Sequence, residues 1–138
     1  KGFMDYTPDE IMNKSIFSVK QDITLLSDNI VHLGGKKIKE IMDRRGLGAG
    51  DIDYFLPHIS SDFFRTRIYD MIEEYGGGIP YEKWFINLYT VGNVGAASIY
   101  LMINEMFHSG KLKKGERLLL LVPESSRFSY MYAMLTVV

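Results

Sequence analysis

Cysteine is absent from the 138 residues of the chain. Its absence excludes disulfide bonds, a thiolate metal site and a cysteine nucleophile within these residues. Long hydrophobic runs are also missing, because the longest strictly apolar run near the C-terminus is LLLLV (118–122), far too short to cross a bilayer. The segment KGFMDYTPDE lacks the apolar core of a signal peptide, and it begins at Lys1 instead of an initiator Met. We therefore expect a cytoplasmic protein without membrane insertion, and a fragment of a longer chain.

Charge of one sign is not in excess either. Lys and Arg number 16 and Asp and Glu number 17, so the net charge of -1 gives no reason to expect binding to nucleic acid. Hydrophobic residues make up 46% and charged residues 24%, as in an ordinary globular protein. A chain of this length is expected to form a single domain, residues 1–138, with a core of its own.

Apolar periodicity predicts the elements of the first half. A Thr-Pro-Asp-Glu start signal at 7–10 predicts a short helix. Apolar residues at helical spacing predict a helical region over 23–45, broken at the glycine pair 34–35 and closed by Gly46. The apolar segment 52–57 predicts a buried strand, followed by a helix with a core-facing stripe.

In the second half, 83–91 predicts another buried strand, followed by a helix that runs to about His108. Residues 116–138 predict two apolar strands around the polar connection 123–127. Repeated strand–helix alternation with a terminal strand pair predicts an α/β fold whose sheet is largely parallel, with an antiparallel edge or return strand.

Two corners carry polar side chains. DIDYFLPHISS places His58 at the end of one predicted strand, and YTVGNVGAAS places Asn93 after the next. A histidine at a strand end is more often structural, bonded to a backbone carbonyl, than catalytic. However, the carboxyl ends of parallel strands open onto the crevice where ligands bind. We therefore expect His58 and Asn93 to face one pocket.

The small residues that follow Asn93, 95–98, have two compatible explanations. They allow the next helix to approach the sheet closely, or they leave space for a substrate arm beside the amide.

Several other site classes are disfavoured. GNVGAA lacks the spacing of the dinucleotide fingerprint, and the glycines of YGGGIP follow a helix instead of opening one. His32, His58 and His108 lie on separate elements, which predicts no metal site. No G-x-S-x-G elbow surrounds a serine. The basic clusters 36–39 and 111–117 are interpreted as solvated surface, and more weakly as attraction for an acidic carrier protein.

DIDYFLPH, GNVGAAS and the closing GERLLLLVPESSRFSYMYAMLTVV resemble the C-terminal half of a type III ketoacyl-acyl-carrier-protein synthase, in the thiolase superfamily. Their order and spacing match from about residue 38 onward and more loosely before it. The resemblance implies a thiolase-like half-domain, a five-stranded mixed sheet with helices on both faces. It also implies a Cys-His-Asn site whose cysteine belongs to an N-terminal half, with no metal and no cofactor. This chain alone would then be inactive.

Residue by residue, the resemblance assigns catalytic roles to His58 and Asn93. Substrate contacts are expected at Ile59, Gly92, Gly95, Ala96, Ser125 and Ser126, and carrier-protein docking is expected at Arg65 and Arg67. The implied partners are acyl-CoA or acyl-carrier-protein thioesters, malonyl-acyl-carrier protein and the carrier protein itself, with a homodimer at full length. Apolar surface left for the other half predicts self-association of the fragment.

The sequence departs from the family pattern at three places. Ile59 stands where the family often has Gln, PESSRF replaces a glycine-rich turn, and Phe63 and Phe64 precede the arginines that follow the histidine. These departures predict a divergent branch that condenses an unusual acyl partner in lipid or polyketide-like synthesis. Two alternatives stay open: acyl transfer to an acceptor other than malonyl thioester, and a non-catalytic partner subunit.

Overall fold

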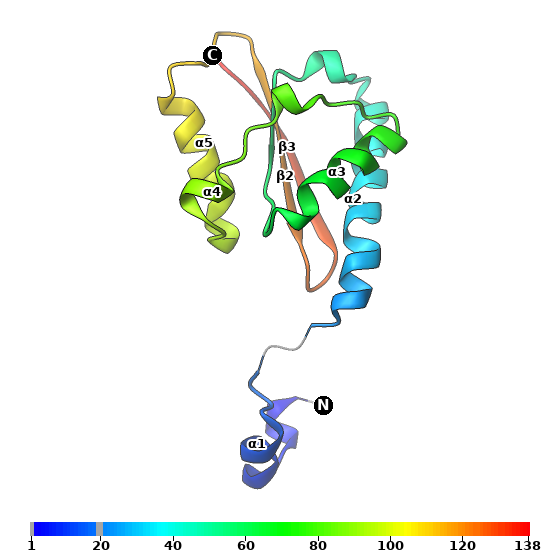
Figure 1. Cartoon of the computed structure of the whole chain (residues 1–138), viewed down its shortest axis with the longest axis vertical. Helices are drawn as coiled ribbons and strands as arrows, with labels where there is room; N and C mark the ends of the chain where they lie inside the picture. Colours follow the sequence, from blue (N-terminus) through cyan, green and yellow to red (C-terminus); the bar gives the residue numbers. More distant parts are fainter. Residues whose placement is uncertain (1, 19–20) are drawn as a thin grey trace.

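The computed structural model describes residues 2–18 and 21–138 (Figure 1). In chain order its helices and strands are α1 (Pro8–Lys14), α2 (Ile23–Arg45), β1 (Tyr54–Pro57), α3 (Phe63–Glu74), α4 (Leu88–Val91), α5 (Ser98–His108), β2 (Arg117–Glu124) and β3 (Ser129–Thr136). Short 3-10 turns lie at Phe3–Asp5, Ala49–Asp51, Tyr81–Lys83 and Gly95–Ala97. No helix in these ranges is long and apolar enough to cross a membrane.

The strands form one mixed sheet in the order β1-β2-β3. β1 runs parallel to β2, with Tyr54 opposite Leu118, and β3 returns antiparallel to β2, with Thr136 opposite Arg117. α2 and α3 lie on one side of the sheet and α4 and α5 on the other (Figure 1). This arrangement confirms the predicted α/β class, the terminal strand pair and the helices on both faces.

The sheet separates two apolar cores. Because successive strand residues point to opposite faces, the leucines of β2 divide between the cores. Leu119 and Leu121 pack with Phe55 on the α2 and α3 side, whereas Leu118 and Leu120 pack with the inner face of α5 on the other. The outer surface of α4, the following turn and α5 carries exposed large apolar side chains, namely Tyr89, Val91, Val94, Tyr100, Leu101 and Phe107.

The predicted strand over 83–91 is wrong. Only Trp84 pairs with the sheet, through a single parallel bridge to Phe55, and within the described residues the sheet has three strands, not five. The indole N–H of Trp84 donates to the Ile79 carbonyl at 2.8 Å, which holds the segment in a turn. From Asn87 onward the chain turns into α4, because the Asn87 carbonyl accepts from Val91 N–H at 2.9 Å.

The predicted break at the glycine pair of α2 is also wrong, because the helix runs unbroken through Gly34 and Gly35. Both glycines are buried against other elements. A Cβ on Gly34 would lie 2.9 Å from Cε1 of Tyr130, and a Cβ on Gly35 would collide with Met71. The glycines therefore serve close packing of α2 against β3 and α3, and the helix tolerates their lower helix propensity.

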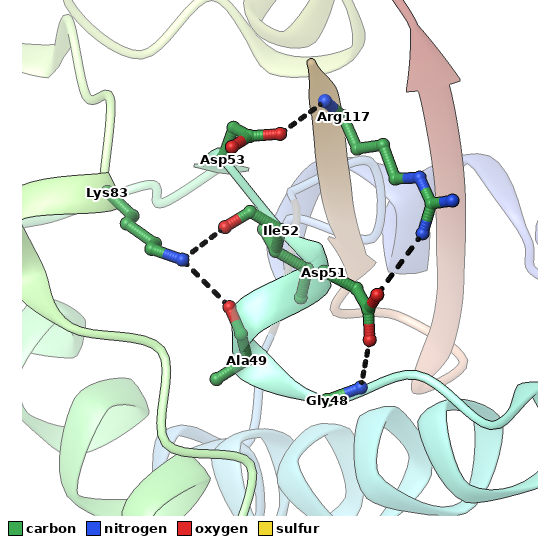
Figure 2. Close-up of polar contacts among 7 residues, drawn as sticks. All are labelled: Gly48, Ala49, Asp51, Ile52, Asp53, Lys83 and Arg117. Atoms are coloured by element: carbon green, nitrogen blue, oxygen red, sulfur yellow. Dashed lines mark hydrogen bonds and ion pairs between the residues drawn. The ribbon is translucent and has the colours of Figure 1, made fainter. Parts of the chain in front are cut away.

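A polar network fixes the start of β1 (Figure 2). The Lys83 ammonium donates to the carbonyls of Ala49 at 2.8 Å and Ile52 at 2.5 Å. The Arg117 backbone N–H donates to Asp53 Oδ2 at 2.8 Å, which joins the entry of β1 to the entry of β2. These contacts fix the register of β1 and therefore the position of the residue that follows it.

The N-terminal start signal is confirmed. Thr7 caps α1: its side chain accepts from the Glu10 N–H, and the Thr7 backbone N–H donates to Glu10 Oε2 at 3.0 Å. α1 has no buried residue and lies apart from the sheet (Figure 1).

Candidate active site

His58 is the first residue after β1. Its backbone N–H donates to the Leu121 carbonyl at 2.8 Å, so the parallel pairing of β1 with β2 extends through this residue. Its side chain is partly buried, and burial lowers the pKa of the imidazole below its usual value. Burial disfavours the charged form, so the ring is a neutral group with one N–H donor near pH 7.

Asn93 lies in the turn between α4 and α5 instead of directly after a strand, which corrects the predicted strand-to-helix corner. Gly92 has φ 81° and ψ -177°, a backbone conformation that is nearly restricted to glycine. Asn93 is exposed, and its Oδ1 accepts from the Gly95 N–H at 3.0 Å. With the carbonyl end of the amide engaged, the NH₂ group is the end that can donate to a ligand.

A small cavity of about 10 Å³ joins the two corners. His58 and Ile59 line it from the end of β1, Gly92 lines it from the α4–α5 turn, and Ser98 lines it from the start of α5. The side chain of Asn93 is not among its lining residues within the described part of the chain. The cavity brings the two corners together, whereas convergence of the His58 and Asn93 side chains stays a prediction.

Asn87 is a contributor that sequence reasoning missed. It lines the small cavity, is buried, and donates from Nδ2 to Glu105 Oε2 at 2.9 Å. This bond ties the start of α4 to α5. The sequence does not indicate a role for Asn87, because the preceding residues Trp84-Phe85-Ile86 have the composition of a strand and Asn87 falls within the strand predicted from them.

A larger cavity of about 250 Å³ lies beside the first, between α2, α3 and the ends of β1 and β2. His58 and Ile59 line both cavities. Ser125, from the turn between β2 and β3, lines the larger one, so the structure brings His58, Ile59 and Ser125 together.

Other predicted substrate residues lie elsewhere. Gly95 and Ala96 are exposed and line neither cavity in the described ranges. Ser126 is occupied with its own turn, because its N–H and hydroxyl both bond to Glu124 Oε1, at 2.8 Å and 2.6 Å. The hydrogen bond from the Ser126 side chain is the main cause that lowers the pKa of Glu124.

The two arginines proposed for docking differ in their surroundings. The guanidinium of Arg67 is exposed, lies 4.2 Å from the centre of the Phe63 ring and donates to Ser27 Oγ at 3.0 Å. Arg65 is partly buried over the Tyr81 ring, at 5.3 Å, and its Nε is buried without a hydrogen-bond partner among the described residues. Arg67 is therefore the more accessible of the two.

The remaining histidines belong to local contacts. His32 contacts the Tyr75 hydroxyl at 3.0 Å, and His108 Nδ1 lies 2.9 Å from the Asn104 carbonyl. In residues 2–18 and 21–138, no three His, Asp or Glu side chains gather in a way that could hold a metal ion.

The architecture is that of a thiolase-like protein. The chain superposes on 3-oxoacyl-(acyl carrier protein) synthase III from Pseudomonas aeruginosa with a TM-score of 0.70 at 22% identity, covering 86% of this chain and 35% of that one. It superposes on OleA from Xanthomonas campestris with a TM-score of 0.72 at 24% identity, covering 84% of this chain and 32% of that one. At these identities the likeness shows the fold.

Sequence comparison gives the family. The model for the 3-oxoacyl-[acyl-carrier-protein (ACP)] synthase III C terminal matches residues 42–123, more than half of the chain. The chain therefore belongs to this family. Beta-ketoacyl-[acyl-carrier-protein] synthase III of Desulfitobacterium hafniense is 30% identical over 115 residues, which are 83% of this chain and 33% of that protein. Its namesake in Clostridium acetobutylicum is 36% identical over 81 residues, 59% of this chain and 23% of that protein. The chain thus spans a third or less of the length of these curated relatives.

Proposed function

We propose that this chain supplies the histidine and the asparagine of a Cys-His-Asn site in a 3-oxoacyl-[acyl-carrier-protein] synthase III-type acyltransferase. The cysteine would come from an N-terminal half, with residues 1–138 forming the C-terminal half. The observation that carries the proposal is the small cavity, which is lined by His58 and by Gly92 and Ser98, the residues on either side of the turn that holds Asn93. Membership of the synthase III family supports it.

The reaction is a decarboxylative Claisen condensation. A malonyl thioester loses CO₂, and the electron pair of the broken carbon–carbon bond forms an enolate whose negative charge lies on the thioester oxygen. The imidazole N–H of His58 and the amide NH₂ of Asn93 would donate to this oxygen. The enolate carbon then attacks the carbonyl of an acyl-cysteine, forms the new carbon–carbon bond and releases the cysteine thiolate.

The electrostatics of His58 suit this role. A neutral imidazole donates a hydrogen bond without the cost of holding a buried positive charge, and burial lowers the pKa of His58 in the required direction. Donors fixed in advance stabilise developing charge without reorganisation, and losing one costs about 10²–10³-fold in rate. The backbone bond from His58 to Leu121 supplies such fixation.

The proposal extends to the partners that such an enzyme requires. Acyl-CoA or acyl-carrier-protein thioesters and malonyl-acyl-carrier protein would be substrates in fatty acid or related lipid synthesis. Arg67 would contribute to docking of the acidic carrier protein, since its guanidinium is exposed. The full-length enzyme would act as a cytoplasmic homodimer.

The test measures CO₂ release from malonyl thioester by the full-length protein. Asn93→Ala and His58→Ala should each reduce the decarboxylation rate by about 10²-fold or more, because each removes a donor to the enolate oxygen. Asn13→Ala and His32→Ala are matched controls, since Asn13 is exposed on α1 and His32 contacts Tyr75 away from both cavities. Rates within a few-fold of wild type for Asn93→Ala would overturn the proposal.

A second candidate is acyl transfer to an acceptor other than malonyl thioester. The apolar Ile59, which lines both cavities beside His58, favours it because the site offers a hydrophobic wall there. Product analysis with and without malonyl donors separates the two reactions. A full-length sequence without a cysteine at a helix N-terminus would instead indicate a non-catalytic partner subunit.

A further inference from the structure

A side-chain contact joins the two corners of the proposed site. The Tyr89 hydroxyl donates to Asp62 Oδ1. Asp62 follows His58 closely in the chain and lies directly before α3. Tyr89 lies in α4, which leads through Gly92 into the turn that holds Asn93. The contact therefore connects the segment after His58 with the short helix before Asn93.

The carboxylate of Asp62 is available for this contact. Asp62 is the N-cap residue of α3, a position where an aspartate usually accepts from the backbone of its own helix. Here its side chain makes no capping bond. The hydrogen bond to Asp62 is instead the main cause that raises the pKa of Tyr89, and the neighbouring Arg65 acts in the opposite direction. The first turn of α3 thus meets α4 through polar groups.

α4 depends on contacts of this kind for its position, because it is only four residues long. Isolated helices of this length are not stable in water, so tertiary contacts must hold it. Its start is tied to α5 by the bond from Asn87 to Glu105. Leu88 lines the small cavity, whereas the next residue, Tyr89, is 68% exposed. The Tyr89 hydroxyl thus ties the outer side of α4 to α3.

From these contacts we infer that Tyr89 is a positioning residue, which sets the distance between His58 and the α4–α5 turn through its bond to Asp62. The bonds inside the turn give the turn its conformation, and the bond to Asp62 places it relative to the end of β1. The catalytic consequence rests on the proposed function, whereas the bridge itself does not. Tyr89 touches no reacting atom and acts through Asn93.

The first experiment measures decarboxylation of malonyl thioester by the full-length protein. Tyr89→Phe keeps the ring and removes only the hydroxyl. The Asn93 amide then remains but is less well placed, so kcat should fall about tenfold at unchanged KM, against about 10²-fold for Asn93→Ala. In the Asn93→Ala background, Tyr89→Phe should cost about twofold or less, because nothing is left for it to position. Asp62→Ala should reproduce the kcat loss of Tyr89→Phe, since it removes the acceptor without removing a cap.

Hydrogen exchange, followed by mass spectrometry, gives a second readout that does not depend on activity. In Tyr89→Phe the backbone amides of residues 92–97 should exchange about threefold faster or more, because a contact that limits local opening is lost. Tyr100→Phe is the matched control. Tyr100 lies on α5, is 71% exposed, and its hydroxyl has no hydrogen-bond partner within residues 2–18 and 21–138. Its substitution should change neither the exchange nor kcat.

The combined results separate the bridge from the reaction. With Asn93→Ala impaired, a kcat of Tyr89→Phe within about twofold of wild type overturns the inference and leaves the proposed function standing. A loss that stays equally large in the Asn93→Ala background overturns it too, because Tyr89 would then act independently of the amide. If Asn93→Ala keeps wild-type activity, the proposed function fails and exchange decides the bridge. Faster exchange in Tyr89→Phe then supports the bridge, and unchanged exchange overturns it.

Discussion

At His58 the backbone continues the parallel pairing of the sheet, since its N–H donates to Leu121 in the neighbouring strand. At Asn93 the bonds join near neighbours instead, from Gly95 N–H to Asn93 Oδ1 at 3.0 Å and from Val94 N–H to Ser98 Oγ at 3.2 Å. The position of the imidazole thus depends on long-range packing, whereas that of the amide depends on the conformation of a short turn. The two halves of the proposed site should therefore respond to different mutations.

The largest effect is expected from Leu121→Ala. Leu121 is 5% exposed, packs in the core and lies in β2 beside His58. Removing its side chain should lower the free energy of unfolding by about 2–5 kcal/mol. Met131→Ala, at a position that is 43% exposed on β3, is the control and should cost much less. Chemical denaturation measures both, and a cost for Leu121→Ala no larger than the control would show that packing does not anchor the His58 corner.

Gly92→Ala tests the other corner. A Cβ at this position meets nothing within 4 Å, so the cost comes from the backbone conformation alone, about 1–3 kcal/mol. The expected result is a modest loss in the free energy of unfolding with the pKa of His58 unchanged. Gly50→Ala also adds a Cβ into open space, without a positive φ, and should cost less than half as much. Equal costs would contradict the claim that this turn depends on glycine.

Asn87→Ala should cost about 1 kcal/mol, because it removes the bond between α4 and α5 and leaves a buried position without its amide. Glu105→Gln keeps an oxygen acceptor and should cost less. Thermal unfolding of the two variants compares them. If Glu105→Gln is the more damaging change, the bond depends on charge more than on the buried amide.

The smallest effect concerns pH. Since burial lowers the pKa of His58 in the folded state, the unfolded chain takes up a proton first as pH falls. Stability contributed by the neutral ring is present above the usual histidine pKa and declines as pH falls through that value. It is fully lost below the folded-state pKa. Histidine resonances in NMR titrations should show His58 with its pKa below the ordinary value, and His58→Gln should flatten the acid side of the stability profile. A raised pKa would contradict the burial argument.

The sequence predicts well those elements whose signal is periodic and long. β2 and β3, the helical register of α2 and the position of His58 after β1 all follow from apolar spacing and strand composition. The segment around Trp84 is different, since its apolar residues pack from a turn and its pairing stops after one residue. The predicted helix break at Gly34 and Gly35 failed because of tertiary packing as well. A glycine pair usually indicates a break, but here the two glycines make room for Tyr130 and Met71.

The site follows the same division. A histidine after a buried strand is predictable from local composition, but the cavity behind it depends on residues that are distant in sequence, such as Ile38, Ile72 and Tyr130. Asn87 gives no signal of its own, since its importance comes from its bond to Glu105 in a later helix.

Two tyrosines of β3 join the strand to α2 in a way that limits how these elements can move. Tyr130 donates to the Ile30 carbonyl and Tyr132 to the Gly34 carbonyl, at 2.6 Å and 2.7 Å. Two residues of strand advance about 6.7 Å and four residues of helix advance about 6 Å. The spacing of the two tyrosine hydroxyls therefore matches the spacing of the two carbonyls that accept from them. Sliding α2 along the strand by a single residue would break both bonds at once. Both bonds can form again only if α2 shifts along the sheet by a full helical turn. The depth of the larger cavity, which α2 borders, would therefore change in steps of one turn and not gradually.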